Sequence, residues 1–577
     1  MIMKLFYKLL ILFAVASLAT ACNKPDDTPD TPKELPAPQN LVLHGSTETS
    51  LTFQWSKVEG ATSYIWALGS EEDIRRTGGT PNRNVTIEEL KPGTSYYFIV
   101  AASGPDGQSP NYSQITVVTQ GTAPSPSSET ICVDAPLVLE LDSAPVLGNS
   151  GLIKIFTASG QEVDRIDLAD RAGVTTREDG ITVPSQQMTN DSKFTSFMDA
   201  LPCSGKWRIV NCTPVRVQGK SLIIKPHSGL LKFNTDYYVT LDAGAIEGHP
   251  GIAEGDWTFT TGSAPASVSQ IRVAEDGSGD FCTIQRALDY AQKDGCTISV
   301  APGSYEETLF LRDKKNIRLK GESRSGVRIV YPNCEAYANG SGGSVSSRPS
   351  PGSSVGKNGG RSVFLIESCD NLELEEVTIE NSFGSTNGQA ETIYFNSSGK
   401  LTIERCALLS YQDTFLCKGE VWVHNSLIAG HCDYVWGYPK ACLFEDCEIR
   451  SRAAGYIVQA RVQSASDKGF VFLGCSLTSE EGVKDGSMYL ARSSGQAECF
   501  DNVTFISCTM GPVIAPEGWH SKVTPNPSKP SATSGWKEFG SVDAGGKSVT
   551  GSRNSLGKVL TAAEAEGYSS RQAVLGW

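Results

Sequence analysis

The stretch LTIERCALLSYQDTFL (401–416) decides the fold, because its first eight residues set a pattern that recurs through the C-terminal half of the chain. Apolar residues occupy the first, third and eighth places, and a small or apolar residue occupies the sixth. The other runs with this pattern are LELEEVTI (372–379), VWVHNSLI (421–428), CLFEDCEI (442–449), FVFLGCSL (470–477) and VTFISCTM (503–510). Single strands that recur every 20–33 residues between Gly, Asn and Ser turns are typical of a parallel β-helix.

Two aspartates follow neighbouring runs at the same offset. Asp413 lies seven residues after Cys406, the sixth residue of its run, and Asp433 lies seven residues after Ser426, which holds the same place. Coils of a β-helix stack about 4.7–4.9 Å apart, so we expect both carboxylates on one outer face. An isolated Asp in such a turn is ordinarily a turn former. Two adjacent carboxylates, however, repel each other, which separates their pKa values and provides one acid and one base or nucleophile.

The 577 residues divide into several segments by composition and strand spacing. Two Pro-rich segments are typical of linkers, and two segments of short alternating strands predict antiparallel β-sandwiches. The predicted order is a signal peptide (1–22), a linker (23–36), a sandwich (37–120), a linker (121–129), a second sandwich (130–262) and the solenoid (266–577). The predicted fold class is therefore all-β, with a right-handed parallel β-helix, a single-stranded solenoid, after two β-sandwich domains.

Two segments of the solenoid region depart from the strand pattern. TIQRALDYAQKDG (283–295) has the spacing of a short amphipathic helix, with Ile284, Leu288 and Ala291 on its inner stripe. We expect this helix to cover the N-terminal end of the solenoid and so to block edge pairing. Residues 334–361 are rich in Gly and Ser, which predicts a mobile excursion from the coils.

The first 22 residues have the features of a bacterial export signal. MIMKLFYK carries positive charge, LLILFAVASLA is apolar, and Cys22 follows small residues. This arrangement resembles a lipoprotein signal with lipidation at Cys22; the alternative is ordinary secretion in which Cys22 has no role. The acidic segment NKPDDTPD that follows resembles the tether of surface-exposed lipoproteins. We therefore expect a lipid-anchored protein of the cell outer membrane, exposed at the cell surface.

Charge and cysteine content restrict the partners and cofactors. The chain has 50 basic and 64 acidic residues, a net charge of −14, and no Lys/Arg-rich block, which argues against a nucleic-acid partner. No clustered His/Cys spacing indicates zinc, so we predict no metal and no cofactor. Of the 16 cysteines, four share the sixth place of the repeated strands, which favours a ladder of buried thiols. Cys203 and Cys212 are the best disulfide candidates by proximity.

The two N-terminal modules each resemble a known type of domain. Trp55 and LKPGTSYYFIV (90–100) resemble the fibronectin type III pattern, which implies that the tryptophan packs in the core and that Tyr96 forms a tyrosine corner. The stretch FNTDYYVTLDAGAIEGHPG, followed by DWTFTTG, resembles bacterial Ig-like modules. The second module could be a spacer, a carbohydrate binder or a packing partner of the solenoid, and these roles remain open.

Residues 271–577 resemble the pectinesterase family, the pectin methylesterases of plants and bacteria. The resemblance rests on several motifs that occur in the family's order. They are VAEDGSGDFCTIQRAL (273–288), GSYEE (303–307), GQAETIYF (388–395), YQDTFL (411–416), GHCDYVWG (430–437), YLARS (489–493) and PEGWH (516–520). This motif context favours a catalytic role over a turn-forming role for the aspartate pair.

The resemblance implies a mechanism and a role for each site residue. Asp433 would attack the methyl ester carbonyl, and Asp413 would act as general acid toward methanol and then as base for water. Gln389 and Gln412 would donate hydrogen bonds to the oxyanion. Arg492 would hold Asp433 ionised and aligned. An arginine beside only one of the two stacked aspartates would also separate their pKa values.

The chain departs from the family pattern near the substrate cleft. The Pro and Trp that follow the arginine in the family are replaced by Ser493 and Ser494. Tyr434 and Trp436 are candidate substrate contacts; Trp436 could take the place of the missing tryptophan or point inward. The resemblance thus supports the ester chemistry better than it supports the substrate.

The predicted function is hydrolysis of the methyl esters of homogalacturonan, giving pectate and methanol. The predicted partners are this pectin polysaccharide and the outer membrane. One alternative is an esterase or thioesterase of the same fold with another substrate; another is a non-catalytic glycan-binding protein of the cell surface. A Ser-His-Asp esterase built on His431 is disfavoured, because the sequence has no Gly-x-Ser-x-Gly elbow at a strand-to-helix turn.

Overall fold

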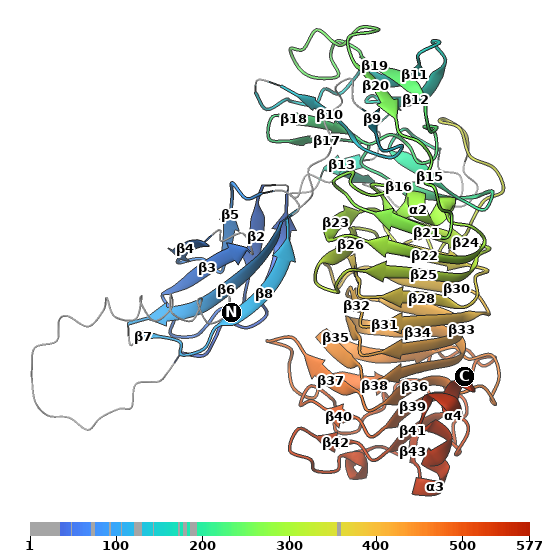
Figure 1. The fold of residues 1–577 in the computed structure, drawn as a ribbon. Coiled ribbons are helices and arrows are strands. Elements are labelled where there is room, and N and C mark those ends of the chain that lie inside the picture. The colour runs from blue at the N-terminus through green and yellow to red at the C-terminus, as the bar shows by residue number, and fades with distance from the viewer. Residues whose placement is uncertain are drawn as a thin grey trace, which may run out of the picture. The chain divides into compact units, whose positions relative to one another are not determined.

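The computed structural model describes residues 35–47, 49–70, 75–91, 94–105, 107–119, 130–141, 143–170, 174–176, 182–184, 193–354 and 359–577. The chain forms two compact units, Met1–Gly121 and Thr122–Trp577. Strands dominate both units, as Figure 1 shows. Within the described ranges, no helix has both the length and the apolar character needed to span a membrane. Cys22 lies outside the described residues.

The first unit is a small antiparallel sandwich with an aromatic core. Its strands are β1 (Val42–Ser46), β2 (Leu51–Gln54), β3 (Ser63–Ser70), β4 (Arg75–Thr80), β5 (Asn84–Ile87), β6 (Ser95–Gly104), β7 (Gly107–Gln108) and β8 (Ser113–Val118). The sheets are β1–β2–β5 and β4–β3–β6–β7, with β8 paired to β6. Trp55 is 2% exposed, and the buried Tyr96 hydroxyl accepts a hydrogen bond from the Lys91 N–H at 2.9 Å. Both aromatic residues therefore have structural roles.

The second unit begins with two further sheets and two hairpins. The sheets are β10–β18–β17 and β12–β11–β19–β20–β9, and the hairpins are β13–β14 and β15–β16. The strands are β9 (Thr130–Ile131), β10 (Leu137–Glu140), β11 (Leu152–Thr157), β12 (Glu162–Asp167), β13 (Val174–Thr176), β14 (Thr182–Pro184), β15 (Met198–Cys203), β16 (Lys206–Asn211), β17 (Val215–Gln218), β18 (Ser221–Ile224), β19 (Asp236–Leu241) and β20 (Thr258–Thr261). We call residues 130–262 the second sandwich.

The rest of the unit is a parallel β-helix of 23 strands in one continuous sheet (Figure 1). The strands are β21 (Gln270–Val273), β22 (Asp294–Val300), β23 (Gly303–Glu306), β24 (Leu309–Arg312), β25 (Lys315–Gly321), β26 (Val327–Tyr331), β27 (Phe364–Glu367), β28 (Leu372–Glu375), β29 (Thr378–Asn381), β30 (Ile393–Asn396), β31 (Lys400–Glu404), β32 (Ala407–Leu409), β33 (Phe415–His424), β34 (Leu427–Glu445), β35 (Glu448–Ala460), β36 (Gly469–Leu473), β37 (Ser476–Ser479), β38 (Met488–Ala491), β39 (Val503–Ile506), β40 (Thr509–Met510), β41 (Trp536–Phe539), β42 (Val542–Asp543) and β43 (Gly557–Val559). The helices are α2 (Ile284–Tyr290), α3 (Ala562–Ala565) and α4 (Arg571–Leu575), with the 3₁₀ turns η1 (Thr550–Ser552) and η2 (Glu566–Tyr568). The predicted fold class is confirmed.

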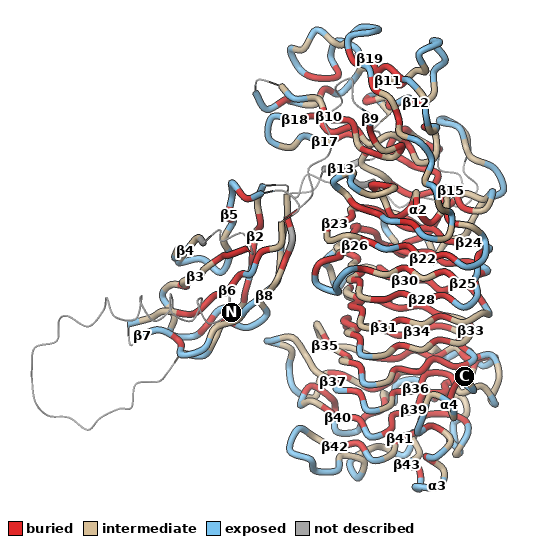
Figure 2. The backbone as a smooth tube through the Cα atoms, viewed as in Figure 1, coloured by how far each residue is buried: buried red, intermediate tan, exposed pale blue. Residues whose placement is uncertain are grey.

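The repeated eight-residue pattern forms stacked ladders inside the β-helix. The third-place residues pair along successive coils in the order Leu374, Ile403, Val423, Phe444, Phe472 and Phe505. The last three rings stack with centroids 4.7 Å and 4.5 Å apart. This continuous interior is drawn as buried along the whole solenoid in Figure 2. The apolar pattern therefore sets the register of the coils.

The cysteines behave as small buried side chains. Cys406, Cys447, Cys475 and Cys508 are all buried as free thiols at the sixth place of their runs. The disulfide expected between Cys203 and Cys212 is wrong. The β15–β16 hairpin pairs Cys203 with Lys206 and Met198 with Asn211, so the two cysteines lie at opposite ends of the hairpin. Proximity in sequence misled here because the hairpin turn falls directly after Cys203.

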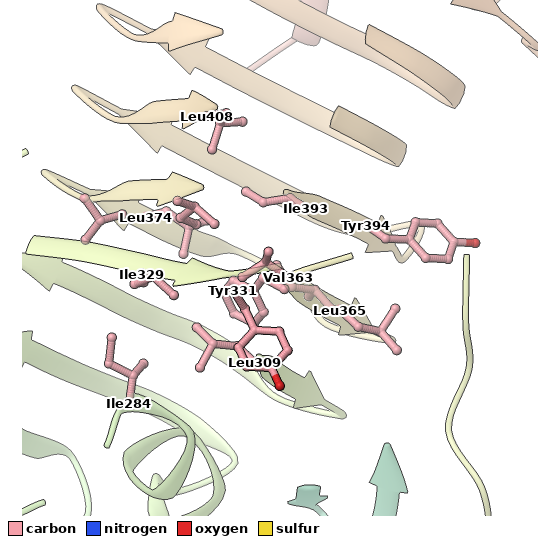
Figure 3. Close-up of a cluster of buried hydrophobic side chains, with 14 of the residues drawn as sticks. Ile284, Leu309, Ile329, Tyr331, Val363, Leu365, Leu374, Ile393, Tyr394 and Leu408 are labelled. Atoms are coloured by element: carbon pink, nitrogen blue, oxygen red, sulfur yellow. The ribbon is translucent and has the colours of Figure 1, made fainter. Parts of the chain in front are cut away.

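Helix α2 covers the N-terminal end of the solenoid. It is shorter than predicted, because residues 294–300 belong to β22. Ile284 and Leu288 are fully buried, and Ile284 lies over a cluster that includes Leu309 and Ile329 (Figure 3). The Thr283 hydroxyl caps the helix by accepting a hydrogen bond from the Arg286 N–H.

The second sandwich packs directly on this end of the β-helix. Their buried side chains form one hydrophobic core. The Asp134 carboxylate accepts hydrogen bonds from the backbone N–H groups of Cys282 at 3.1 Å and Thr283 at 2.7 Å. The ring of Phe233 contacts that of Tyr290. Of the three roles left open by the sequence, the structure therefore shows a packing partner.

Residues 334–354 and 359–361 leave the coils, as the predicted excursion does, and lie against the second sandwich. Val345 bridges Trp207 of β16, and Arg348 donates hydrogen bonds to the carbonyls of Ala200 and Ser228 at 3.2 Å and 2.8 Å. We call this segment the excursion. Its described residues are anchored by these contacts, which the Gly/Ser-rich composition did not indicate.

Candidate active site

Asp413 and Asp433 lie on neighbouring coils, as the spacing of the sequence predicts. Gln412 bridges Cys432, and the Asp413 N–H donates a hydrogen bond to the Cys432 carbonyl at 3.0 Å. Both carboxylates are almost fully buried, with exposures of 4% and 3%. Both residues also have positive φ, 65° and 48°, in the left-handed region that Asp and Asn enter more readily than most residues. At both positions, therefore, the residue that turns the backbone also supplies the carboxyl group of the site.

Asp433 accepts hydrogen bonds at both of its oxygens. The Arg492 Nε donates to Oδ1 at 2.7 Å, and a second guanidinium nitrogen of Arg492 donates to Oδ2. The Gln459 amide donates to Oδ2 at 2.8 Å. Such charge-assisted contacts stabilise the ionised form of a carboxylate and fix its orientation. Asp433 is therefore arranged as the anionic member of the pair.

A second arginine holds Gln459 in place. Arg461 donates to the Gln459 carbonyl oxygen from Nε at 2.9 Å and from Nη2 at 2.5 Å. Because the side-chain oxygen Oε1 of Gln459 accepts both hydrogen bonds from Arg461, the side-chain NH₂ group is the end that donates to Asp433. The Arg461 guanidinium in turn lies 4.9 Å from the centroid of the Trp436 ring.

Asp413 has the opposite electrostatic character. Burial raises its pKa well above the usual range, and the charges of Glu391 and Asp433 raise it further, while Arg361 and Arg461 oppose the shift. Asp413 therefore keeps its proton to a higher pH than an exposed aspartate does. A protonated carboxyl beside an anionic one is the combination needed for a general acid beside a nucleophile.

The argument that an arginine stands beside only one aspartate is wrong. Arg361 Nη2 contacts the Asp413 Oδ2 atom at 3.0 Å, so each aspartate has its own guanidinium. The pKa of Asp413 is raised all the same, because burial and the charge of Glu391 outweigh Arg361, whose Nε also contacts the Glu391 oxygens at 2.8 Å and 3.0 Å. Sequence reasoning missed both residues of this ion pair.

Gln389 and Gln412 stack on successive coils above Cys432. Isolated bridges join Gln389 to Gln412 and Gln412 to Cys432. The side-chain oxygen Oε1 of Gln389 accepts a hydrogen bond from Arg361 Nη1 at 2.9 Å. The side-chain NH₂ group of Gln389 is therefore the end that can donate to another group. The bridges therefore place both glutamine residues beside the aspartate pair, and the amide of Gln389 is oriented to donate rather than to accept.

Four residues of the site were not found from the sequence: Arg361, Glu391, Gln459 and Arg461. Glu391 did leave a signal, because it lies two residues before Ile393 of β30, in a run from Ala390 to Phe395 in which every residue is buried. A charged residue in a buried run requires an oppositely charged or hydrogen-bonding partner that is buried beside it. The partner, Arg361, lies at the end of the excursion, where no periodicity marks it.

The predicted substrate contacts have different surroundings. Tyr434 is fully buried and its hydroxyl lies 3.4 Å from Ser451, so it faces the interior and cannot contact a substrate. Trp436 is 6% exposed beneath Arg461. His431 has one ring nitrogen 3.3 Å from the Ala454 carbonyl, and its burial lowers its pKa. His431 has no hydrogen bond to Asp433 and does not form a triad with it.

Aromatic side chains gather beside Arg492, close to Ser494, which stands where the resembled family has a tryptophan. Tyr456, Tyr489 and His520 contact one another with ring centroids 4.7–6.0 Å apart, and the Arg492 guanidinium lies 4.9 Å from the centroid of Tyr456. All three rings are partly exposed. Ser493 instead donates a hydrogen bond to the buried Asp501 at 2.8 Å. We call the three rings the aromatic cluster.

One group of possible metal ligands occurs in the part of the chain that the structure describes. It consists of Cys132, Asp134 and Cys282, at the junction of the second sandwich and helix α2. Asp134 already accepts hydrogen bonds from the Thr283 N–H and hydroxyl, at 2.7 Å and 2.6 Å, and so has a structural role. The cluster belongs to the module junction and not to the aspartate site.

Comparisons with known proteins identify the families of two parts of the chain. Residues 270–575, more than half of the chain, match the family model described as Pectinesterase, and residues 36–119 match that of the fibronectin type III domain. The chain is 30% identical over 267 residues to Pectinesterase 31 of Arabidopsis thaliana, covering 44% of this chain and 78% of the relative. It is 29% identical over 289 residues to Probable pectinesterase A of Aspergillus flavus, covering 49% and 81%.

Solved structures show similar coverage at lower identity. The pectin methylesterase from carrot is 21% identical, with a TM-score of 0.46 over 54% of this chain and 95% of that one. The pectin methylesterase of Aspergillus niger is 24% identical, with a TM-score of 0.43 over 54% and 95%. The family match over residues 270–575 and the relatives at up to 30% identity are decisive, and the chain belongs to the pectinesterase family.

Proposed function

We propose that this pectinesterase hydrolyses the methyl esters of homogalacturonan with Asp433 as the nucleophile and Asp413 as the proton donor. The observation that carries the proposal is the unequal pair of stacked carboxyls. Asp433 is held by Arg492 and Gln459, which favours its anion. Asp413 is buried beside a second carboxyl, which raises its pKa.

The first half of the reaction forms an acyl-enzyme. A carboxylate oxygen of Asp433 attacks the ester carbonyl carbon, and the negative charge that develops on the carbonyl oxygen is stabilised by the amides of Gln389 and Gln412. The bond to the methoxy oxygen then breaks. Asp413 transfers its proton to that oxygen, so methanol leaves and Asp413 becomes a carboxylate, while the galacturonyl group is held on Asp433 as a mixed anhydride.

The second half regenerates the enzyme with water. The Asp413 carboxylate takes a proton from water as the hydroxide attacks the anhydride carbonyl. The bond to Asp433 breaks and returns Asp433 as a carboxylate, leaving a galacturonic acid group that loses its proton to the solvent to become galacturonate. Arg492 and Gln459 stabilise Asp433 as the departing carboxylate, and the proton on Asp413 is restored, which closes the cycle.

The aromatic cluster supports a sugar-binding role near the reacting ester. Partly exposed rings can pack on the apolar faces of pyranose units, and the Tyr456 ring is fixed by its contact with Arg492. A Tyr456→Ala variant should raise KM for methylated pectin several-fold with a smaller change in kcat. An unchanged KM would remove this ring from the binding surface.

A second candidate keeps the chemistry and changes the substrate. The observation that favours it is the Ser493–Ser494 pair, where Ser493 bonds the buried Asp501 in place of the family Pro-Trp. The test is a panel of methyl-esterified, acetylated and feruloylated polysaccharides together with acyl thioesters. Methanol from methylated homogalacturonan as the dominant product supports the first candidate; turnover confined to another ester or thioester supports the second.

We also propose that the protein is a lipoprotein of the cell outer membrane, anchored at Cys22. Support comes from the apolar run before Cys22 and the acidic, Pro-rich segment after it. A Cys22→Ala variant should move from the membrane fraction to the soluble fraction and lose its acyl chains by mass spectrometry. Membrane association that survives this change would contradict the anchor.

A further inference from the structure

Two arginines connect the second sandwich to the reacting groups. We infer that Arg208 of β16 and Arg361 of the excursion are positioning residues, which together fix Gln389 and Asp413 for catalysis. This inference rests on the proposed function, because it assigns those two residues a role in ester hydrolysis. It gives the second sandwich a part in the reaction, in addition to covering the end of the β-helix.

Arg208 is fully buried and contacts only uncharged oxygens. Burial lowers its pKa to about 9, against the opposing charges of Glu367 and Glu391. Its acceptors are the carbonyls of Leu309 (2.5 Å), Gly359 (2.9 Å), Gly360 (3.4 Å), Ser362 (2.5 Å) and Val363 (3.1 Å), with the Ser362 hydroxyl at 3.2 Å. Among the described residues this cation has six oxygen acceptors and no ion pair, and burial of a charge without a counter-charge costs free energy that covering the end of a solenoid does not require.

All the acceptors of Arg208 except Leu309 flank Arg361 in the sequence. Gly359 and Gly360 precede it, and Ser362 and Val363 follow it. The two glycines are closely packed: a Cβ on Gly359 would lie 2.2 Å from the Ile209 carbonyl oxygen, and one on Gly360, at φ 76°, would lie 2.3 Å from the Gly342 nitrogen. Arg208 thus fixes the segment from which Arg361 enters the site.

Arg361 is the residue that contacts both reacting groups. It is 5% exposed, and its guanidinium contacts the Gln389 carbonyl oxygen at 2.9 Å and Asp413 Oδ2 at 3.0 Å. The first contact leaves the Gln389 amide N–H₂ group as the end that can donate to an oxyanion. The second occupies one oxygen of Asp413 and leaves Oδ1 for the leaving methoxy group. A single side chain therefore orients an oxyanion donor and the proton donor together.

Glu391 balances the charge of Arg361 so that Asp413 can keep its proton. Glu391 is 0% exposed and contacts Arg361 Nε through both oxygens, whereas Asp413 is held by one contact. One guanidinium between two buried carboxyls balances one negative charge, and the better-held carboxylate is Glu391. Glu335 also pairs with Arg361, but its side chain is 31% exposed and its charge is partly screened by water. Burial raises the pKa of Glu391 as well, but Asp413 has fewer contacts with Arg361 and its pKa is raised well above the usual range, so the proton is held on Asp413.

The charged groups that face Asp413 come from several elements and all enter the pH argument. They are Arg361 of the excursion, Glu391 before β30, Asp433 of β34 and Arg461 after β35. Replacing Glu391 by Gln removes a negative charge while keeping the shape of the side chain. Arg361 then favours the Asp413 carboxylate, so Asp413 should lose its proton at a lower pH.

The test is the pH profile of kcat/KM for methanol release by the full chain. Activity needs a protonated Asp413 and therefore falls as pH rises through its pKa. Glu391→Gln should move this alkaline limb down by at least about one pH unit, and Glu391→Asp, which keeps the charge, should restore it. Arg361→Met should lower kcat by about 100-fold or more at every pH, because the oxyanion donor and the proton donor both lose their anchor.

Arg208 is tested through the split between kcat and KM, with Arg348→Met as the matched control. Arg348 also donates from the same module junction to backbone carbonyls, but it contacts neither Gly359–Val363 nor the aspartate site. Arg208→Met should lower kcat roughly 10–100-fold with little change in KM, whereas Arg348→Met should leave kcat unchanged. Equal effects of the two variants, or a Glu391→Gln profile that keeps the wild-type alkaline limb, would overturn the inference.

Folding and basal activity are read in the same experiment. Circular dichroism and thermal melts establish that each variant is folded. If the Arg208→Met chain does not fold, the pH profile of Glu391→Gln alone tests the positioning role. Wild-type chain that releases no methanol contradicts the proposed function itself. Wild-type release with an unshifted Glu391→Gln profile contradicts only the positioning role.

Discussion

At the scale of single residues, Asp413 and Asp433 serve the backbone and the chemistry at once. Both turn the chain in the left-handed region and both place a carboxyl on the same face of neighbouring coils. Asn tolerates this conformation nearly as well as Asp, whereas Ala does not gain from a side-chain bond to the local backbone. Asn is therefore the substitution that separates chemistry from backbone strain at both positions.

Replacing the nucleophile should abolish turnover without unfolding the protein. Asp433→Asn keeps the turn but leaves one amide oxygen to accept from Arg492 and removes the anionic nucleophile, so kcat should fall by at least about 10⁴-fold. Methanol release and thermal melts measured on the same sample check this result. Activity within tenfold of wild type would assign the attack to another group.

Asp413 should show opposite effects on activity and stability. Its folded-state pKa is raised, so the stability linked to this group is present below the unfolded value and is lost as pH rises through the folded value. Asp413→Asn removes the buried ionisation. At pH values above that pKa it should raise the free energy of unfolding by about 1.4 kcal/mol for each pH unit by which the pKa is raised, and the melting temperature should rise with it. The same variant should lose methanol release. A melting temperature that is unchanged at all pH values would contradict the raised pKa.

The sequence revealed the aspartates but only part of their surroundings. Asp413 and Asp433 could be paired because the offset from Cys406 and Ser426 is fixed by the coil register, and Arg492 came from a motif. Arg361 could not be placed, since it stands after a long segment whose path depends on contacts with the second sandwich. The roles assigned to Asp413, Asp433, Gln389, Gln412 and Arg492 remain predictions until variants are measured.

At the scale of elements, the ladders hold the coils in register. The stacked rings of Phe444, Phe472 and Phe505 lie one per coil, at third places that could be predicted from the eight-residue pattern. The limits of helix α2 were less well predicted, because DGCTISV (294–300) pairs with both β21 and β25 and so is taken into the sheet. Pairing partners on both sides outweigh a helical pattern that extends to residue 295.

Removing the middle ring of the ladder should cost a large share of the stability. Phe472→Ala empties a site stacked on both sides, and we expect a loss of about 3–5 kcal/mol in the free energy of unfolding. Phe156→Ala, which removes a partly exposed ring stacked on Tyr238, is the control and should cost less. Urea denaturation measures both. Equal losses would mean that the ladder contributes no more than an ordinary aromatic pair.

At the scale of the whole molecule, the second sandwich and the β-helix form one folding unit. Their cores are continuous, and Arg208 and Asp134 connect the two backbones. The sequence predicted a sandwich here from its alternating strands but left its role open, because contacts between modules have no periodicity to read. Residues 122–577 belong to one compact unit and residues 1–121 to another.

This organisation predicts the thermal behaviour of the chain. Calorimetry should show two transitions, one for the fibronectin type III module and one shared by the second sandwich and the β-helix. A fragment of residues 266–577 should melt at a lower temperature than the larger unit, since it exposes the apolar end around Ile284 and Phe281. A separate third transition for residues 130–262 would contradict the shared core.

The measurement that tests the central claim most directly is methanol release from highly methylated homogalacturonan by the full chain and by its Asp433→Asn variant. The account predicts rapid release by the wild type, with pectate as the other product, and release at the background rate by a variant that melts like the wild type. Release by both chains, or by neither while both are folded, would contradict the assignment of Asp433 as the nucleophile of a pectin methylesterase.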